Sequence, residues 1–249
     1  MRTPERKCCP VCGEAGKRIG GFPLCGPCLE SIPWLTHTVC AKCGRPEACP
    51  DCARRTNAAF VAHRSAVRYS PLMKEWLIRY KYAGDERMES VLAWMMLSGY
   101  ERLLIEVCGS TTRNVFDGIT YVPLSPERIK ERGFNQAARL AQALGRELGV
   151  PVAPLLRKKK ETARQSQKGR LERIHEIRGA FTVEPAVAQH YLRSLSAIKK
   201  RQSGRAPLRP LRLLLIDDVY TTGSTINECA RMLRQALPCY VYALTWARS

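Results

Sequence analysis

Two adjacent carboxylates and a hydroxyl-rich turn are the residues of this chain whose types and spacing best suit chemistry. Asp217 and Asp218 follow the apolar run 213–216, and the segment 221–225 reads Thr-Thr-Gly-Ser-Thr. A short apolar run of this kind is typical of a strand buried on both faces of a parallel sheet, and the two acids are expected to end that strand. The apolar spacing after residue 225 predicts a helix, so the turn is expected at a helix N-terminus.

A turn of this composition is suited to holding a phosphate. Unpaired backbone N–H groups and the helix dipole favour an anion there, and Gly223 lets the backbone approach it closely. The carboxylates of Asp217 and Asp218 can reach the hydroxyls of an attached sugar and stabilise positive charge at its anomeric carbon. We therefore expect these two residues to be catalytic. Four hydroxyl side chains can donate further hydrogen bonds to the phosphate: Thr221, Thr222, Ser224 and Thr225.

The sugar-phosphate site must be positioned by an α/β sheet, and the cysteines indicate a second module before it. Nine of the twelve cysteines lie between residues 8 and 52, and eight of them form four Cys-x-x-Cys pairs. Two such pairs make a closed tetrahedral zinc site, which is structural rather than catalytic. Both neighbouring and crossed combinations of pairs use the same residues, and both stay open. The predicted zinc ligands are Cys9, Cys12, Cys25, Cys28, Cys40, Cys43, Cys49 and Cys52.

The net charge of +19 favours a polyanionic partner. Residues 157–205 carry 14 Lys and Arg against four Asp and Glu, which is about half of the surplus. Two Cys₄ zinc sites would leave residues 1–55 about neutral, because each site adds four thiolates and one Zn²⁺. A polyanion is therefore expected on the second domain.

The segment 213–225 resembles the signature of type I phosphoribosyltransferases that binds phosphoribosyl pyrophosphate (PRPP). Four apolar residues, two acids and two mostly apolar residues lead into Thr-Thr-Gly-x-Thr. The resemblance implies a mostly parallel α/β sheet with its site at the carboxyl ends of the strands. It also implies that the turn binds the 5′-phosphate, that the acids contact the ribose and that Mg²⁺ bridges ribose and diphosphate.

Further segments resemble the ComF family in the same order. After the four cysteine pairs come 79–85 (RYKYAGD), 122–126 (VPLSP), 131–136 (ERGFNQ) and 178–181 (RGAF). That family joins an N-terminal zinc region to a phosphoribosyltransferase domain, is associated with bacterial competence and is implicated in handling incoming single-stranded DNA. The resemblance implies PRPP with Mg²⁺ as ligand. Single-stranded DNA and competence or helicase proteins are its implied partners.

By the same resemblance, the segment after the buried strand 119–124 is the pyrophosphate loop. Arg128 and Arg132 would then bind the diphosphate; as i,i+4 neighbours they repel each other without an anion, and the alternative is a solvated helix face. Lys81 could face the same pocket or lie on the surface. The basic stretch 157–178 could cover PRPP or guide a nucleic-acid backbone. Glu176 stands where the family would have asparagine.

The expected organisation is a cysteine-rich double zinc-ribbon module at 1–55 and a phosphoribosyltransferase-like α/β domain at 56–249. A β-prone stretch lies near 59–69, and 237–246 is expected as the strand after the PRPP helix. A basic insertion near 185–210 should contain a short helix and then a flexible basic loop at 199–205. No signal peptide is expected, and the most apolar segment, 91–107, should not span a membrane because charged residues interrupt it. The location should be cytoplasmic.

Three functions remain open at this stage. The chain could bind Mg²⁺ and PRPP and act in DNA uptake with single-stranded DNA binding. It could instead be a phosphoribosyltransferase for a base or amine acceptor, with no direct role in DNA handling. It could also be an adaptor that senses PRPP. No aromatic-rich segment marks a base-stacking platform, which argues against direct readout of DNA.

Overall fold

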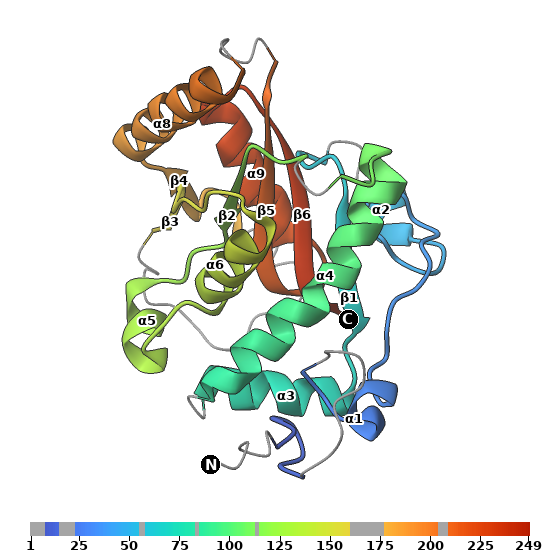
Figure 1. Cartoon of the computed structure of the whole chain (residues 1–249). Coiled ribbons are helices and arrows are strands. Elements are labelled where there is room, and N and C mark those ends of the chain that lie inside the picture. The colour runs from blue at the N-terminus through green and yellow to red at the C-terminus, as the bar shows by residue number, and fades with distance from the viewer. Residues whose placement is uncertain are drawn as a thin grey trace.

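A four-stranded parallel sheet lies at the centre of the computed structural model (Figure 1). The structure describes residues 8–14, 23–54, 58–82, 85–112, 115–159, 177–203 and 209–249. The strand order is β1-β6-β5-β2, so the last two strands of the chain lie between the first two. The predicted α/β class with a mostly parallel sheet is confirmed. The four strands are β1 (His63–Arg68), β2 (Gly118–Tyr121), β5 (Leu211–Tyr220) and β6 (Cys239–Arg248).

Helices connect and cover these strands, and a small antiparallel pair of strands accompanies the sheet. The pair consists of β3 (Leu156–Lys158) and β4 (Phe181–Val183). The helices are α1 (Gly26–Glu30), α2 (Pro50–Arg54), α3 (Pro71–Tyr82), α4 (Glu86–Cys108), α5 (Pro126–Arg132), α6 (Gln136–Leu148), α8 (Pro185–Ser203) and α9 (Ser224–Ala236).

The apolar run in β5 supplies both faces of the sheet. Leu214 and Ile216 belong to a core cluster with α3, α4 and α6, whereas Leu213 and Leu215 belong to a second cluster with α8 and α9. All four side chains are fully buried. The alternation follows from the two-residue period of a strand and explains why the run has no polar positions.

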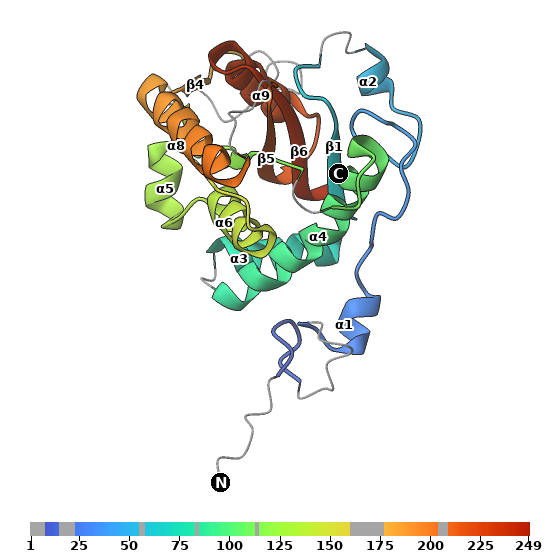
Figure 2. The same cartoon turned by 45° about the horizontal axis from the view of Figure 1, so that its top comes forward.

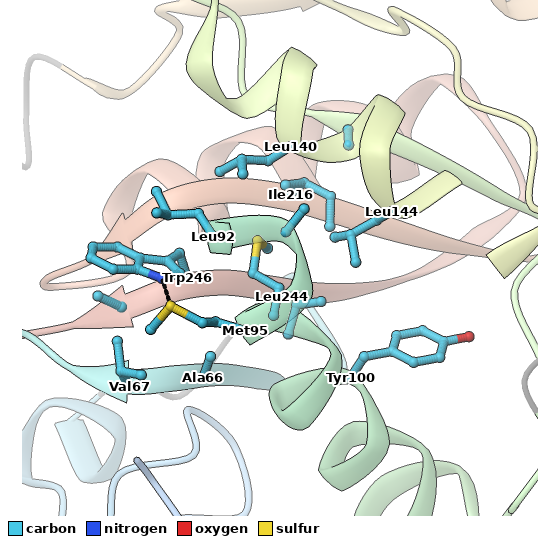
Figure 3. Close-up of a cluster of buried hydrophobic side chains, with 14 of the residues drawn as sticks. Ala66, Val67, Leu92, Met95, Tyr100, Leu140, Leu144, Ile216, Leu244 and Trp246 are labelled. Atoms are coloured by element: carbon cyan, nitrogen blue, oxygen red, sulfur yellow. Dashed lines mark hydrogen bonds between the residues drawn. The ribbon is translucent and has the colours of Figure 1, made fainter. Parts of the chain in front are cut away.

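The first cluster is the interface between α4, α6 and the sheet. Figure 3 shows Leu92 and Met95 of α4 and Leu140 of α6 packed over Ile216 and Trp246. The indole Nε1 of Trp246 donates to the Met95 sulfur at 3.4 Å, so its polar atom is not left unpaired in the core. Helix α6 begins with a side-chain cap, because Asn135 accepts from the backbone N–H of Ala138 at 3.1 Å.

Two details of the sequence-based expectation are wrong. The acids were expected to end the strand, but β5 continues through them to Tyr220. The segment 199–205 was expected to be a flexible loop, but α8 continues through it as far as Ser203; residues 204 and 205 lie outside the described part of the chain. The β-prone stretch near 59–69 is confirmed as β1, an edge strand of the sheet. The strand expected at 237–246 is confirmed as β6.

The two cysteine-rich segments lie at different places on the molecule. Helix α1 and the first cysteines are set apart from the sheet, while α2 lies on the side of β1 (Figure 2). The segment expected not to span a membrane, 91–107, lies inside α4, which packs on the sheet. Within the described residues, no helix has the length and apolar character needed to cross a bilayer.

Candidate functional site

The predicted phosphate turn is a tight connection between β5 and α9. Gly223 is the N-cap of α9 and adopts a left-handed conformation with φ of 74°, which glycine adopts without steric cost. Gly223 offers no side-chain cap, and the N–H of Ser224 makes only a long bond of 3.4 Å to Thr222 Oγ1, so this helix N-terminus can accept an anion. Thr222 and Ser224 share a hydroxyl hydrogen bond of 2.9 Å. Thr221 is exposed, and Thr222, Ser224 and Thr225 are half-buried.

The two acids stand directly before the turn. Asp217 is only partly exposed, and its Oδ1 accepts from the backbone N–H of Asp218 at 2.9 Å. Burial by the surrounding protein, followed by the charge of Asp218, raises the pKa of Asp217 well above its usual range, against a smaller opposing effect of Lys81. A cation or a hydrogen-bond donor next to the two carboxylates would therefore stabilise their charged forms.

Lys81 is a site residue that the sequence left undecided. Its ammonium Nζ lies 2.5 Å from Oδ2 of Asp218, and both side chains are less than one-fifth exposed. Lys81 lies in the last turn of α3, so the pair joins the end of that helix to the carboxyl end of β5. Nothing in the local sequence around residue 81 indicates this contact, because the two residues are brought together only by the packing of α3 beside the sheet.

The segment predicted to be the pyrophosphate loop is the short helix α5. Ser125 caps it and Pro126 is its first residue. Arg132 packs its guanidinium 5.3 Å from the ring centroid of Tyr82, and its Nη2 donates to the Tyr82 hydroxyl at 3.1 Å. The buried Nε of Arg132 has no hydrogen-bond partner among the residues the structure describes. Arg128 is exposed one turn earlier on the same helix.

Helix α3 therefore places two of its last residues at the site. Lys81 contacts Asp218, and Tyr82, although its side chain is 58% exposed, holds Arg132. The structure brings the acids, the turn and Lys81 together at one sheet edge, and Tyr82 joins Arg132 to the end of the same helix. Among the described residues, no hydrogen bond or ion pair joins Arg128 to the acids, and its role in binding diphosphate stays a prediction.

The eight predicted zinc ligands form two groups in space. Neighbouring pairs combine, so the crossed arrangement that the spacing had left open is not found. Within each group all four sulfurs lie within 4.8 Å of one another. The members are Cys9, Cys12, Cys25 and Cys28 in the first group and Cys40, Cys43, Cys49 and Cys52 in the second.

The sulfur positions fit a tetrahedral zinc ion. Four thiolates at the usual Zn–S distance of about 2.3 Å lie about 3.8 Å from one another. The sulfurs of Cys12 and Cys25 are 3.7 Å apart, and those of Cys43 and Cys49 are 3.5 Å apart. Burial raises the pKa of Cys9, but the backbone N–H groups near it, led by that of Cys12, lower the value to about 6. Such N–H groups stabilise thiolates, the form that binds metal.

The two cysteine groups are attached to different parts of the fold. Arg79 of α3 donates to the backbone carbonyls of Val11 at 2.7 Å and Pro10 at 2.8 Å, and thereby holds the first Cys-x-x-Cys turn. The second group is attached to the sheet, because the carbonyl of Lys42 accepts from the backbone N–H of His63 at 2.8 Å. Burial, with the nearby charge of Arg248 and other arginines, lowers the pKa of His63 to about 3, so its ring is neutral at physiological pH.

Most of the basic stretch 157–178, which was predicted to cover the site, lies outside the described residues. The part outside is 160–176, which includes Glu176. Just after this stretch, the backbone N–H of Gly179 donates to the Glu228 carboxylate of α9 at 2.6 Å and attaches the chain to that helix.

An open groove of about 540 Å³ lies elsewhere on the molecule. It is lined by residues of α4 and α6, namely Arg87, Glu89, Ser90, Arg139 and Gln142. None of these residues belongs to the 217–225 segment.

Comparison with known proteins identifies relatives along nearly the whole chain. Competence protein ComFC of Streptococcus pneumoniae is 30% identical over 246 residues, which cover 92% of this chain and 94% of the relative. Competence protein ComFC of Bacillus subtilis is 29% identical, with 91% and 84% covered. The DNA utilization protein YhgH of Salmonella typhimurium is 27% identical, with 86% of each chain covered.

Other comparisons add less. No family model matches the sequence. Adenine phosphoribosyltransferase from Thermoanaerobacter pseudethanolicus aligns with 67% of this chain and 83% of its own, with a TM-score of 0.34 and 11% identity. A similarity at that level does not by itself establish a shared fold.

Proposed function

This chain belongs to the ComF family of competence proteins, and from that premise we propose that it binds PRPP with Mg²⁺ and acts in DNA uptake or utilisation. The observation that carries the proposal is the adjacency of Asp217 and Asp218 to an uncapped helix N-terminus. Sugar hydroxyls and a phosphate are the groups that such acids and N–H donors recognise.

Each part of the proposed ligand has a matching part of the site. The turn 221–225 would bind the 5′-phosphate through N–H and hydroxyl donors, and the carboxylates of Asp217 and Asp218 would bind the ribose hydroxyls. Arg132, whose buried Nε lacks a partner among the described residues, would bind the diphosphate together with Arg128.

Magnesium fits the same arrangement. It prefers carboxylate and phosphate oxygens, and Asp217 and Asp218 offer the carboxylates. Bound there, the ion would neutralise charge between the ribose and the diphosphate. The residues of the chain then have two tasks, which are to orient the sugar and to stabilise positive charge at its anomeric carbon. The acceptor of a transfer reaction, a base or an amine, is not needed for the binding proposal.

Structural zinc is the second part of the proposal. The two Cys₄ groups, with sulfurs 3.5 to 3.7 Å apart where pairs are in contact, would hold two ions without an open coordination position. Zinc would stabilise residues 1–55 as a module, because a segment this short buries too little apolar area to fold alone.

A calorimetric titration with PRPP and Mg²⁺ tests the site directly. The zinc-loaded chain should bind saturably, and the Asp217→Asn, Asp218→Asn double variant should lose binding by at least about tenfold, since it removes both charges from a partly buried pair. A matched control is Glu75→Gln, which removes an exposed carboxylate of α3. Absence of binding to the unmodified chain contradicts the proposal.

Single-stranded DNA binding is a second proposed function. The groove between α4 and α6 supports it, because Arg87 and Arg139 line it. Glu89 pairs with Arg139 at 3.6 Å and with Arg146 at 3.7 Å. Exposed ion pairs of this kind contribute little and can be exchanged for phosphates. Affinity for an oligonucleotide should fall steeply between about 50 and 200 mM salt, and an Arg139→Gln, Arg146→Gln variant should show a smaller slope. Binding that is insensitive to salt would oppose this function.

A further inference from the structure

The backbone carbonyl of Cys43, one of the second group of zinc ligands, is held by two side chains from the sheet. His63 donates from Nδ1 at 3.0 Å, and Arg248 donates from Nη1 at 2.7 Å. Because a carbonyl only accepts, Nδ1 of His63 must carry the proton. His63 and Arg248 are both almost fully buried, and Cys43 is buried as well. The cysteine turn and the sheet are thus joined by buried hydrogen bonds.

The same two side chains contact one aromatic ring. The imidazole of His63 stacks on Tyr220, with ring centroids 4.0 Å apart and an interplanar angle of 20°. The guanidinium carbon of Arg248 lies 5.2 Å from the centroid of the Tyr220 ring. Tyr220 is the last residue of β5 and is 3% exposed. Its ring position is therefore fixed by the groups that hold Cys43.

Tyr220 in turn supports the phosphate turn. A Cβ atom built on Gly223 would lie 2.1 Å from the Tyr220 hydroxyl oxygen and 2.5 Å from its Cζ. The hydroxyl therefore rests directly against the Cα side of Gly223, the residue whose left-handed conformation starts α9. If the ring moved, the turn would lose the surface against which it folds.

We propose that Tyr220 is a positioning residue that holds the phosphate turn against the second Cys₄ group, so that zinc at that group sets the affinity of the turn for a phosphate. The inference rests on the proposed function for its ligand. The first Cys₄ group provides a contrast, because Arg79 attaches it to α3 instead.

The second Cys₄ group is packed closely against β1. Gly44 follows the ligand Cys43, and a Cβ there would lie 2.7 Å from the His63 carbonyl oxygen. The carbonyl of Ala41, inside the same Cys-x-x-Cys turn, accepts from Arg64 Nη1 at 3.0 Å. A zinc ion bound there would fix the positions of Cys40 and Cys43, and with them the carbonyl that His63 and Arg248 share.

Hydrogen exchange of the full zinc-loaded chain tests the link without any ligand. The informative amides are those of Ser224, which donates to Thr222 Oγ1, and Asn227, which donates to the Gly223 carbonyl. Tyr220→Leu should speed their exchange by about tenfold, the size expected for losing one ring stack and one cation–π contact. Tyr220→Phe keeps the ring and should stay within about threefold. Tyr240→Leu, at a half-exposed tyrosine of β6, is the matched control.

The metal arm compares the two cysteine groups. Cys49→Ser should speed exchange at the same amides, whereas Cys12→Ser should change it by less than about twofold. Equal effects of the two variants would overturn the inference, because they would indicate general destabilisation. Unchanged exchange at Ser224 and Asn227 in Tyr220→Leu would also overturn it.

Titration with PRPP and Mg²⁺ separates this inference from the proposed function. Tyr220→Leu should weaken binding by about tenfold while two zinc ions remain bound. If the unmodified chain does not bind PRPP, the proposed function fails, and the exchange result still decides whether Tyr220 links the turn to the second Cys₄ group. If the unmodified chain and Tyr220→Leu bind equally well, the positioning role of Tyr220 is refuted.

Discussion

Replacement of Lys81 by methionine removes the cation that lies 2.5 Å from the Asp218 carboxylate. At that distance, and with an effective dielectric constant of about 20, the Coulomb attraction is about 6 to 7 kcal/mol before desolvation is subtracted. Exposed pairs contribute at most about 1 kcal/mol, and breaking a fully buried pair costs about 3 to 5 kcal/mol. Because Lys81 and Asp218 are 17% and 18% exposed, we expect Lys81→Met to cost about 2 kcal/mol of unfolding free energy.

The loss should depend on pH, because Lys81 also opposes the raised pKa of Asp217. Without Lys81 that pKa rises further, so the folded state retains a proton to higher pH. The destabilisation is therefore expected to be smaller at about pH 5.5 than at about pH 8. Urea unfolding of the zinc-loaded chain at both pH values measures it.

A double-mutant cycle with Asp218→Asn isolates the pair. The coupling energy between residues 81 and 218 should be about 2 kcal/mol. Lys74→Met provides the control, since Lys74 is an exposed lysine on the same helix and should change stability by less than about 0.5 kcal/mol. A coupling energy below about 0.5 kcal/mol would refute the assignment of Lys81 to the site.

Three further predictions concern the acid, the glycine and the metal. Asp217→Asn should stabilise the ligand-free chain above the raised pKa of Asp217, because it removes a charge that burial disfavours, and the gain should vanish as pH falls below about 3.9. A thermal-melting series over pH that shows a gain independent of pH would contradict it. Gly223→Ala should lower the free energy of unfolding by about 2 to 4 kcal/mol, because alanine is strained in the left-handed conformation and its Cβ would clash with Tyr220. Gly149→Ala, whose Cβ would meet nothing within 4 Å, should cost about 1 kcal/mol. Equal urea midpoints for the two variants would contradict the close packing. The purified chain should contain two zinc ions by metal analysis. Chelation should abolish the circular dichroism of the cysteine-rich module, and a signal retained without zinc would contradict a structural role of the metal.

The residues around Asp217 could be predicted from the sequence because their signal is local. A buried strand, two acids and a Gly-containing turn are consecutive, and the structure places them in β5 and at the start of α9. The extra length of β5 could not be foreseen, because it depends on pairing with β6, which continues past the acids as far as Tyr220 and Arg248. Local polarity at residues 217 and 218 had suggested an earlier end.

The misread helices had signals in the sequence. Ser125 followed by Pro126 is a helix start, with a capping side chain and a proline at the first position, and α5 begins there. Lys199 and its neighbours have good helix propensity, so charge alone was a poor reason to expect a loop, and α8 includes them.

The role of Lys81 is different, since no local pattern could reveal it. Residues 79–82 end α3, and consecutive helical residues point in directions about 100° apart. Arg79 accordingly holds the first cysteine turn, Tyr80 donates to the Gln136 carbonyl at 3.0 Å, Lys81 reaches Asp218, and Tyr82 holds Arg132. One helix end thus contacts four separate parts of the molecule. Such a residue is identifiable only when the packing of α3 is known.

This arrangement has a consequence for how the site could respond to its ligand. The acid nearest the turn, Asp218, is already paired with Lys81, and Arg132 is already held by Tyr82, the next residue of α3. A ligand that competes for the carboxylate or for the guanidinium must therefore act on the same helix end. Arg79, two residues before Lys81, connects that end to the first cysteine group. Any movement of α3 on ligand binding would consequently displace the first Cys₄ group. The turn 221–225, in contrast, is attached through Tyr220 to the second Cys₄ group.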